Sequence, residues 1–166
     1  MAAARTLLLL GLALVLGGCG FQLRDDADLP PQMAQTQMVI NDQYSTLARR
    51  VKTMLEQNGV RFVNADQASA ILEIPENEVV TNVLTIGNNA RVQEYRITHT
   101  VQFRLSDAQG NEILPMQTLR QTSVVRFNEE KILAMSREQE YLKKDLAETL
   151  ARLLVTRLES VSAGSG

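Results

Sequence analysis

The amino-acid sequence predicts an α+β fold in which two helices pack on one face of a mainly antiparallel four-stranded sheet, in the order β-α-β-β-β-α. From residue 70 onward, long segments rich in Val, Ile and Thr are separated by turns rich in Gly and Asn, which is typical of hairpins. On either side of that region, apolar residues recur at helical spacing. Placing both helices on the same sheet face is the simplest way to bury both apolar stripes.

The first predicted elements are a short strand and a helix. Thr36 to Asn41 has the composition of a strand, and either Asp42 or Ser45 can cap the helix that follows. One face of this helix carries Leu47, Val51, Met54 and Leu55. Asn58-Gly59 provides a left-handed stop, after which Val60 to Val63 is expected to continue as an extended piece packed after the helix.

An antiparallel meander is predicted next. Its strands are expected at residues 71–86, 92–105 and 112–127. Gly87-Asn88-Asn89 and the segment from Asp107 to Asn111 are the turns between them. Pro75 and Pro115 cannot donate a ladder hydrogen bond, so we expect them at strand ends, bulges or an edge.

The last predicted element is a helix with a sustained apolar stripe. Ser136 and Gln139 form a capping box at its start, and residues 128–135 are expected to form a preliminary helical turn. The stripe consists of Leu142, Leu146, Leu150, Leu153, Leu154 and Leu158. Residues 162–166 are expected to form a flexible tail.

The N-terminus has the pattern of a bacterial lipoprotein export signal. Arg5 precedes an apolar run from Leu7 to Leu16, which is far shorter than the ~20 residues of a transmembrane helix. Leu16-Gly17-Gly18-Cys19 then offers a branched apolar residue, two small residues and a thiol that can accept lipid. We therefore predict that residues 1–18 are cleaved and that Cys19, the one cysteine of the chain, becomes the lipidated N-terminus.

The remaining chain is predicted to form a single domain on a tether. Residues 19–35 are polar and contain Pro30-Pro31, and residues 36–161 form the α/β sandwich domain. Removal of Arg5 leaves 16 of the 17 basic residues against 19 acidic ones, a net charge of about −3. A generally basic surface for nucleic acid is therefore excluded, and any anion must bind at a local cluster.

Strand alternation predicts such a cluster on the sheet face that the helices leave open. Arg96 and Arg104 alternate with the apolar residues of one strand, and Arg120 and Arg126 do so in the next. The face is interpreted either as an ordinary solvated surface or as a docking surface for carboxylate or phosphate groups. The one histidine of the chain, His99, falls on the apolar face and is interpreted as a core or rim histidine.

Catalysis and metal binding find little support in the sequence. With one histidine and a cysteine committed to lipid, no nucleophilic triad is convincing, and no metal-ligand spacing occurs. We therefore expect a non-enzyme without a cofactor.

Several segments resemble one known family. Residues 16–24, Leu-Gly-Gly-Cys-Gly-Phe-Gln-Leu-Arg, resemble the opening of the LPS-assembly lipoprotein LptE family, which has a lipobox followed by Gly, an aromatic residue, a variable residue and Leu-Arg. Residues 47–59 with Val60, the pair Glu94-Tyr95 and residues 127–139 resemble its first helix, middle strand and link into the last helix.

The resemblance implies an outer-membrane lipoprotein that plugs the LptD β-barrel, assists assembly of that barrel and binds lipopolysaccharide during its delivery to the cell surface. It also implies lipopolysaccharide contacts near Arg91, in the loop before Glu94-Tyr95, and near Arg137, at the start of the last helix. Gly20 after the lipidated cysteine lacks the acidic signal for inner-membrane retention, in keeping with an outer-membrane location.

A different class of function remains open at this point. The chain is alternatively a free-standing periplasmic-face adaptor or ligand-binding lipoprotein that never enters a barrel. A small hydrolase would need a convergent catalytic site that the sequence does not offer.

Overall fold

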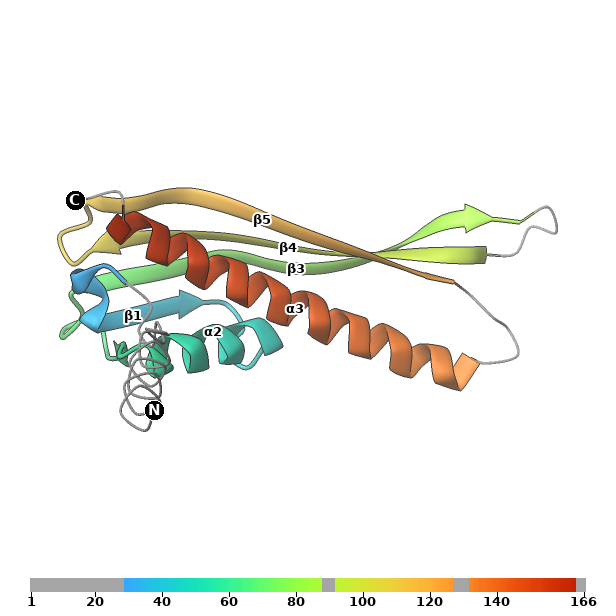
Figure 1. The fold of residues 1–166 in the computed structure, drawn as a ribbon, viewed down its shortest axis with the longest axis horizontal. Helices are drawn as coiled ribbons and strands as arrows, with labels where there is room; N and C mark the ends of the chain where they lie inside the picture. The colour runs from blue at the N-terminus through green and yellow to red at the C-terminus, as the bar shows by residue number, and fades with distance from the viewer. Residues whose placement is uncertain (1–28, 88–91, 127–131, 164–166) are drawn as a thin grey trace, which may run out of the picture.

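The computed structural model describes residues 29–87, 92–126 and 132–163 as one elongated sheet with two helices across a single face (Figure 1). The elements follow the order η1 (Pro31–Ala34), β1 (Gln35–Ile40), α2 (Thr46–Gln57), β2 (Arg61–Phe62), β3 (Ala70–Ile86), β4 (Val92–Asp107), β5 (Glu112–Arg126) and α3 (Ile132–Ala163). The predicted α+β class with two helices on one face is therefore confirmed.

The sheet differs from the prediction because it is five-stranded and mixed. Its order is β2-β1-β3-β4-β5, with β1 parallel to both β2 and β3, and with β3, β4 and β5 antiparallel to one another. Arg61 and Phe62, within the segment expected to be merely extended, pair with Gln35 and Thr36. Two residues are too few to show a strand period. The direction is parallel because α2 carries the chain back along β1 before β2 begins.

Helix α2 begins and ends at the predicted residues. Ser45, rather than Asp42, is the N-cap, because its side-chain oxygen accepts a hydrogen bond from the amide of Ala48 at 3.2 Å. Gly59 adopts φ of +84°, the left-handed conformation that ends the helix at small steric cost.

Helix α3 begins earlier than its capping box indicates. The helix starts at Ile132, so Ser136 lies inside its first turns and residues 132–135 are continuous with the helix rather than a separate turn. Residues 127–131, including Phe127, lie outside the described part of the chain. With 32 residues the helix is about 48 Å long, which lets it run along most of the sheet.

The prolines and the second turn of the meander lie where the sequence places them. Pro75 falls in a register shift between Glu73 and Glu76, and Pro115 is in β5, the edge strand. In the turn after β4, one carboxylate oxygen of Asp107 accepts hydrogen bonds from two amides of the turn. Gly110 has φ of +86° there.

Part of the predicted tether packs on the domain. Pro31–Ala34 forms a turn of 3₁₀ helix, and the side chain of Met33 is only 1% exposed. The Thr36 hydroxyl donates to the carbonyl of Met33 at 2.7 Å, which fixes this turn against β1. The chain is therefore anchored to the core from Leu29 onward, whereas the predicted signal, its cleavage site and Cys19 lie outside the described residues.

One apolar core lies between the sheet and both helices. The α3 residues Leu150, Leu154 and Leu158 are fully buried there with Leu47 of α2 and Phe103 of β4. A smaller cluster formed by Ile97, Val125 and Leu146 continues it along the sheet. The sequence predicts that Tyr95, Ile97, His99, Val101, Phe103 and Leu105 of β4 face the helices. The last five are buried and Tyr95 is half-buried, which confirms the alternation.

The predicted stripe of α3 provides a matched test of this core. We expect Leu150→Asp to lower the free energy of unfolding by several kcal/mol, because it buries an unpaired carboxylate. Leu153, three residues further on, is 38% exposed and lies at the margin of the stripe. Leu153→Asp should cost much less, and urea unfolding of both variants measures the difference. Equal losses would mean that the buried face of α3 is assigned wrongly.

Candidate functional site

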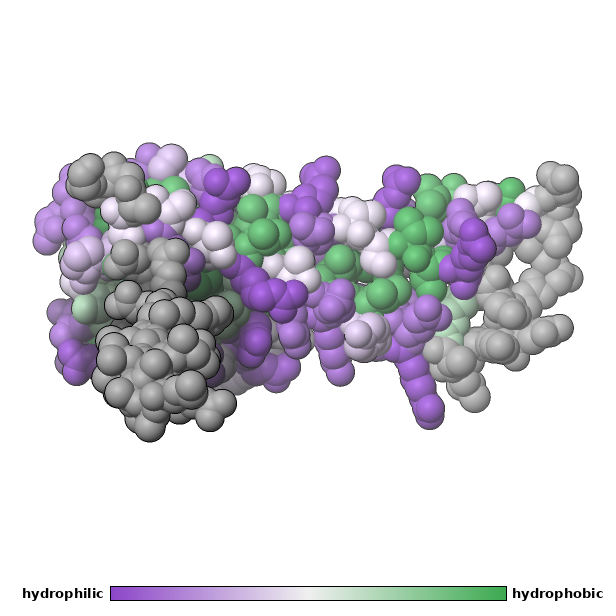
Figure 2. Space-filling model, in the orientation of Figure 1, coloured by the Kyte–Doolittle hydropathy of each residue, from purple (hydrophilic) through white to green (hydrophobic). Residues whose placement is uncertain are grey.

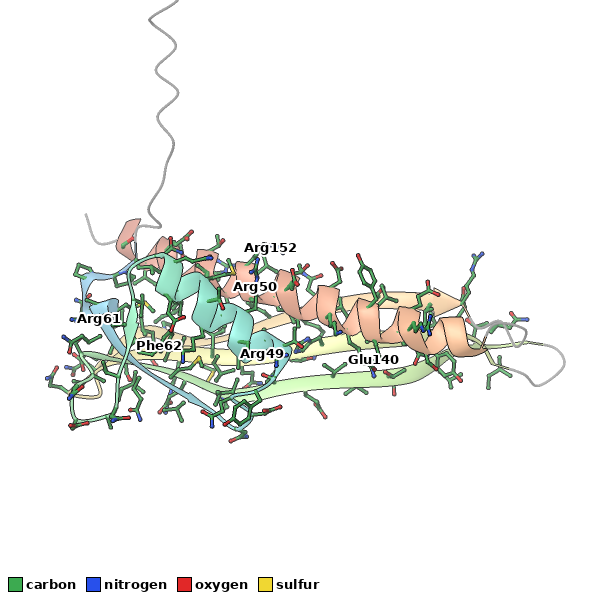
Figure 3. The ribbon with its side chains drawn as sticks, turned by 90° about the horizontal axis from the view of Figure 1, so that it is seen from below. Arg49, Arg50, Arg61, Phe62, Glu140 and Arg152 are labelled. Atoms are coloured by element: carbon green, nitrogen blue, oxygen red, sulfur yellow. The ribbon has the colours of Figure 1, made fainter. Side chains whose placement is uncertain are left out.

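The sheet face opposite the helices is the surface on which the sequence places its arginines. Arg96 and Arg104 of β4 and Arg120 and Arg126 of β5 are all exposed there, as predicted. Directly opposed pairs on this face include Thr100 with Arg120 and Thr98 with Thr122. Viewed along the sheet, α2 and α3 lie on one side only, which leaves these residues uncovered (Figure 3).

Acidic residues of β3 share this face and offset part of its charge. Glu73 forms a hydrogen-bonded ion pair with Arg104, which raises the pKa of Arg104, and Glu94 forms an ion pair with Arg126 at 3.4 Å. Opposite β4, Glu76 and Glu78 add two more carboxylates. The open face is therefore charge-balanced, with Glu73, Glu76 and Glu78 on β3, Glu94 on β4, and the arginines on β4 and β5. Alternation within single strands does not reveal this, because it depends on the register between strands.

Two of the four predicted arginines remain without an ion pair. Within the described residues, Arg96 and Arg120 have no carboxylate within 4.0 Å. Their cross-strand neighbours are Val124 and Thr100, which are uncharged. They are the guanidinium groups on this face that are available to an external anion.

The family resemblance implies lipopolysaccharide contacts in two segments, and both segments belong to one end of the molecule. Arg91 lies outside the described residues, but Gly87 before it and Val92 after it flank the β3–β4 connection at that end (Figure 1). Arg137 is exposed in the first part of α3, which begins at the same end. The fold thus brings these distant parts of the sequence to a common end of the domain.

Exposed apolar side chains also gather over this half of the molecule, a feature the sequence reasoning missed. Figure 2 shows hydrophobic surface between charged residues on the half that holds the start of α3. The large exposed side chains there are Val79, Val80, Val83, Leu84, Ile86, Val124 and Tyr141. Ile86 is 63% exposed and Tyr141 67%. These side chains lie on both sides of the sheet: Val79 and Val83 pair with His99 and Tyr95 on the helix side, whereas Val80 and Val124 pair with Thr98 and Arg96 on the open face. Strand alternation assigns each residue to a side, but it cannot predict that the helices leave Val79 and Val83 exposed.

His99 is a buried histidine with only one of its two ring nitrogens hydrogen-bonded. It is 2% exposed, and its Nε2 lies 2.8 Å from Oδ1 of Asn77. Its Nδ1 is buried and has no partner among the described residues. Burial lowers the pKa of His99, because the charged ring is poorly solvated there. The prediction of a core histidine is correct in position, although the ring is incompletely satisfied.

The described residues show neither a metal-type cluster nor a membrane-spanning helix. Across residues 29–87, 92–126 and 132–163, no three His, Cys, Asp or Glu side chains converge as metal ligands. No helix in the same ranges combines the length and the apolar character needed to cross a membrane.

Solved structures of bacterial lipoproteins share this fold. The chain is similar to lipoprotein B from Nitrosomonas europaea, with a TM-score of 0.73 and 23% identity, covering 87% of this chain and 93% of that one. It is also similar to rare lipoprotein B from Shewanella oneidensis, with a TM-score of 0.68 and 23% identity, covering 78% and 97%. The fold is that of a small bacterial lipoprotein domain.

Sequence comparison identifies the family within that class. Residues 34–158 match the family model of LptE, described as lipopolysaccharide-assembly, and the chain belongs to this family. The LPS-assembly lipoprotein LptE of Photorhabdus laumondii is 29% identical over 156 residues, covering 93% of this chain and 85% of that protein. The protein of the same name from Yersinia pestis is 32% identical over 162 residues, covering 94% and 76%.

The buried His99 predicts a pH dependence of stability. Because its folded-state pKa is lowered, the unfolded chain binds the proton more readily. The stabilisation is therefore complete above the ordinary pKa of about 6.5 and is lost as the pH falls towards the folded-state pKa. We expect the free energy of unfolding, measured with urea from about pH 5 to pH 8, to rise with pH more steeply for the native chain than for His99→Gln. Parallel profiles would contradict this assignment.

Proposed function

We propose that this chain is an outer-membrane lipoprotein that forms a plug in an LptD-type β-barrel, assists assembly of that barrel, and binds lipopolysaccharide during its delivery to the cell surface. The observation that carries the proposal is membership of the LptE family over residues 34–158. The relatives that match along most of the chain are named LPS-assembly lipoproteins. We also propose that residues 1–18 are removed, that residues 19–35 include the lipidated tether and that residues 36–161 form the plug domain.

The shape and surface of the domain suit a plug. Three long strands and a helix of about 48 Å make the molecule long and narrow. The open face presents threonines and balanced charges, and the inward-facing residues of large membrane barrels are polar as well. A charge-balanced surface can exchange its ion pairs for contacts with a polar wall, whereas an apolar face could not be left open in such a lumen.

The end of the domain where α3 begins suits an amphipathic lipid. Lipopolysaccharide combines phosphates with acyl chains, and this end combines Arg137 with the exposed apolar side chains of β3 and Tyr141. Arg91 belongs to the connection at the same end. We assign phosphate contacts to Arg91 and Arg137, and we assign Arg96 and Arg120 to the barrel wall or the ligand. Arg104 and Arg126 serve mainly to hold Glu73 and Glu94.

Co-purification tests the plug against a free-standing adaptor. The full chain should be extracted from outer membranes in mild detergent as a stoichiometric complex with a large, heat-modifiable barrel protein. Recovery of the chain alone under the same conditions would favour the free-standing periplasmic-face adaptor.

The lipid anchor predicts the location of the protein. Cys19→Ser should abolish lipidation and move the domain into the aqueous phase of a detergent partition, while its thermal unfolding stays unchanged because the described core starts at Leu29. Ser69→Ala, far from the anchor in sequence, is the control that should remain in the detergent phase. Recovery of the native chain mainly from inner membranes would overturn the outer-membrane location.

The proposed phosphate contacts predict a loss of lipopolysaccharide affinity. Arg91→Asp combined with Arg137→Asp should weaken binding about tenfold or more, because each charge-assisted hydrogen bond to a phosphate is replaced by repulsion. Barrel association should be retained. Binding of lipopolysaccharide to the detergent-purified chain over a salt series measures the effect.

A second double variant, Arg96→Asp with Arg120→Asp, carries the same change in charge on the open face. If it abolishes lipopolysaccharide binding while the first variant binds normally, the ligand site lies on the sheet.

A further inference from the structure

A pocket with both polar and apolar lining residues lies between the start of α2, the middle of the sheet and α3, away from the open face. Its volume is about 320 Å³, which falls within the range of about 300–1,000 Å³ for small-ligand sites. The α2 end contributes residues from Asp42 to Leu47, the strands contribute Asn77, Val79 and His99, and α3 contributes Glu140, Lys143, Lys144 and Ala147. In Figure 3, Arg49 and Glu140 mark the two helices that border this region.

The start of α2 supplies hydrogen-bond donors to this pocket. Ser45 caps the amide of Ala48, which leaves the amides of Thr46 and Leu47 without an acceptor among the described residues. Both of these residues line the pocket. Free amides at a helix N-terminus, together with the positive end of the helix dipole, favour an anion.

A chain of hydrogen bonds determines which nitrogen of His99 is unprotonated. The Ser45 hydroxyl oxygen accepts from the Asn77 amide nitrogen at 3.1 Å, so Asn77 must present its Oδ1 to His99. Nε2 of His99 therefore carries the proton and donates it to this oxygen. Nδ1 is then the site at which a neutral His99 can take up a second proton, and none of the described residues forms a hydrogen bond with it.

The charges around the pocket are nearly balanced without a ligand. Lys143 donates to Glu140 at 2.9 Å, so these two groups largely cancel. Lys144 has no carboxylate within 4.0 Å among the described residues. Asp42, on the other side, accepts a hydrogen bond from the amide of Tyr44. The cationic groups left for a ligand are Lys144 and the helix terminus, with His99 once it is protonated.

We propose that this pocket binds a phosphate group, and that His99 takes up a proton from solvent at Nδ1 when it does. The free amides of Thr46 and Leu47 and the Nζ of Lys144 hold the phosphate oxygens. The bound negative charge offsets the cost of a buried imidazolium, and Nε2 keeps its bond to Asn77 in either state. Phosphate binding and histidine protonation therefore assist each other. This site does not depend on the proposed plug function.

The volume of the pocket leaves room for the group esterified to the phosphate. A phospholipid headgroup and a phosphorylated sugar share this chemistry, and Asp42 at the rim would favour a ligand that also carries an ammonium group. Inorganic phosphate, phosphoethanolamine and glucosamine 6-phosphate are therefore the three probes.

The single histidine of the chain makes the test direct. The full chain, labelled at histidine and purified in detergent, is titrated with each probe while the ¹H–¹³C signal of the imidazole is followed over pH. Saturating phosphate should raise the pKa of His99 by about one unit, which requires affinity about tenfold higher for the protonated ring. The probe with the highest affinity identifies the natural source of the phosphate.

Matched variants separate this site from binding elsewhere. Lys144→Gln should weaken phosphate binding about tenfold, whereas Lys52→Gln, the same change on α2 outside the pocket, should leave it unchanged. His99→Gln keeps a donor for Asn77 and should reduce the pH dependence of binding, measured by calorimetry, to the part that comes from the second ionisation of the phosphate itself, whose pKa is about 6. The proposal is overturned if no probe shifts the histidine signal, or if Lys144→Gln and Lys52→Gln bind phosphate equally.

Discussion

The burial of two apolar helix stripes against one face of a single sheet is the constraint on which the rest of the structure depends. Leu47, Val51 and Leu55 of α2 and the leucines of α3 share one core with the inward residues of β3 and β4. Since both helices occupy the same face, the opposite face has no apolar partner within the domain and is largely polar, although Val80 and Val124 are exposed on it beside Thr98 and Arg96. The exposed arginines and threonines follow from this arrangement, as does the availability of the face for a partner.

Ion pairs within the open face reduce its net charge, so the face as a whole does not attract ions strongly. Glu73 with Arg104 and Glu94 with Arg126 are solvent-exposed pairs, and such pairs contribute little to stability. Their more important effect is to reduce the net field, so that Arg96 and Arg120 stand out as cations with no ion pair in the described part of the chain. A partner that supplies its own carboxylates or hydroxyls gains most at those two residues.

The two ends of the molecule differ in how completely the helices cover the sheet. Near Met33 and Phe103 the core is closed by α2, α3 and the turn before β1. Towards the start of α3 the cover consists of one helix only, and side chains such as Val83 and Ile86 remain exposed. The incomplete cover places apolar surface beside basic residues, a combination suited to a lipid with phosphate groups. The same single-helix region borders the pocket at His99.

The sequence by itself determined the elements and their faces, because helix and strand periods are local. A cap at Asp42 or Ser45, the stop at Gly59 and the alternation from Ile97 to Leu105 were all predictable, and the resemblance of residues 16–24 pointed to the family. The tertiary structure alone decided the pairing of β2 with β1, the ion pairs between Glu73 and Arg104, and the polar chain from Ser45 to His99. These contacts join residues 22 to 32 positions apart. Register and helix placement, which arise only when the whole core packs, bring such residues together.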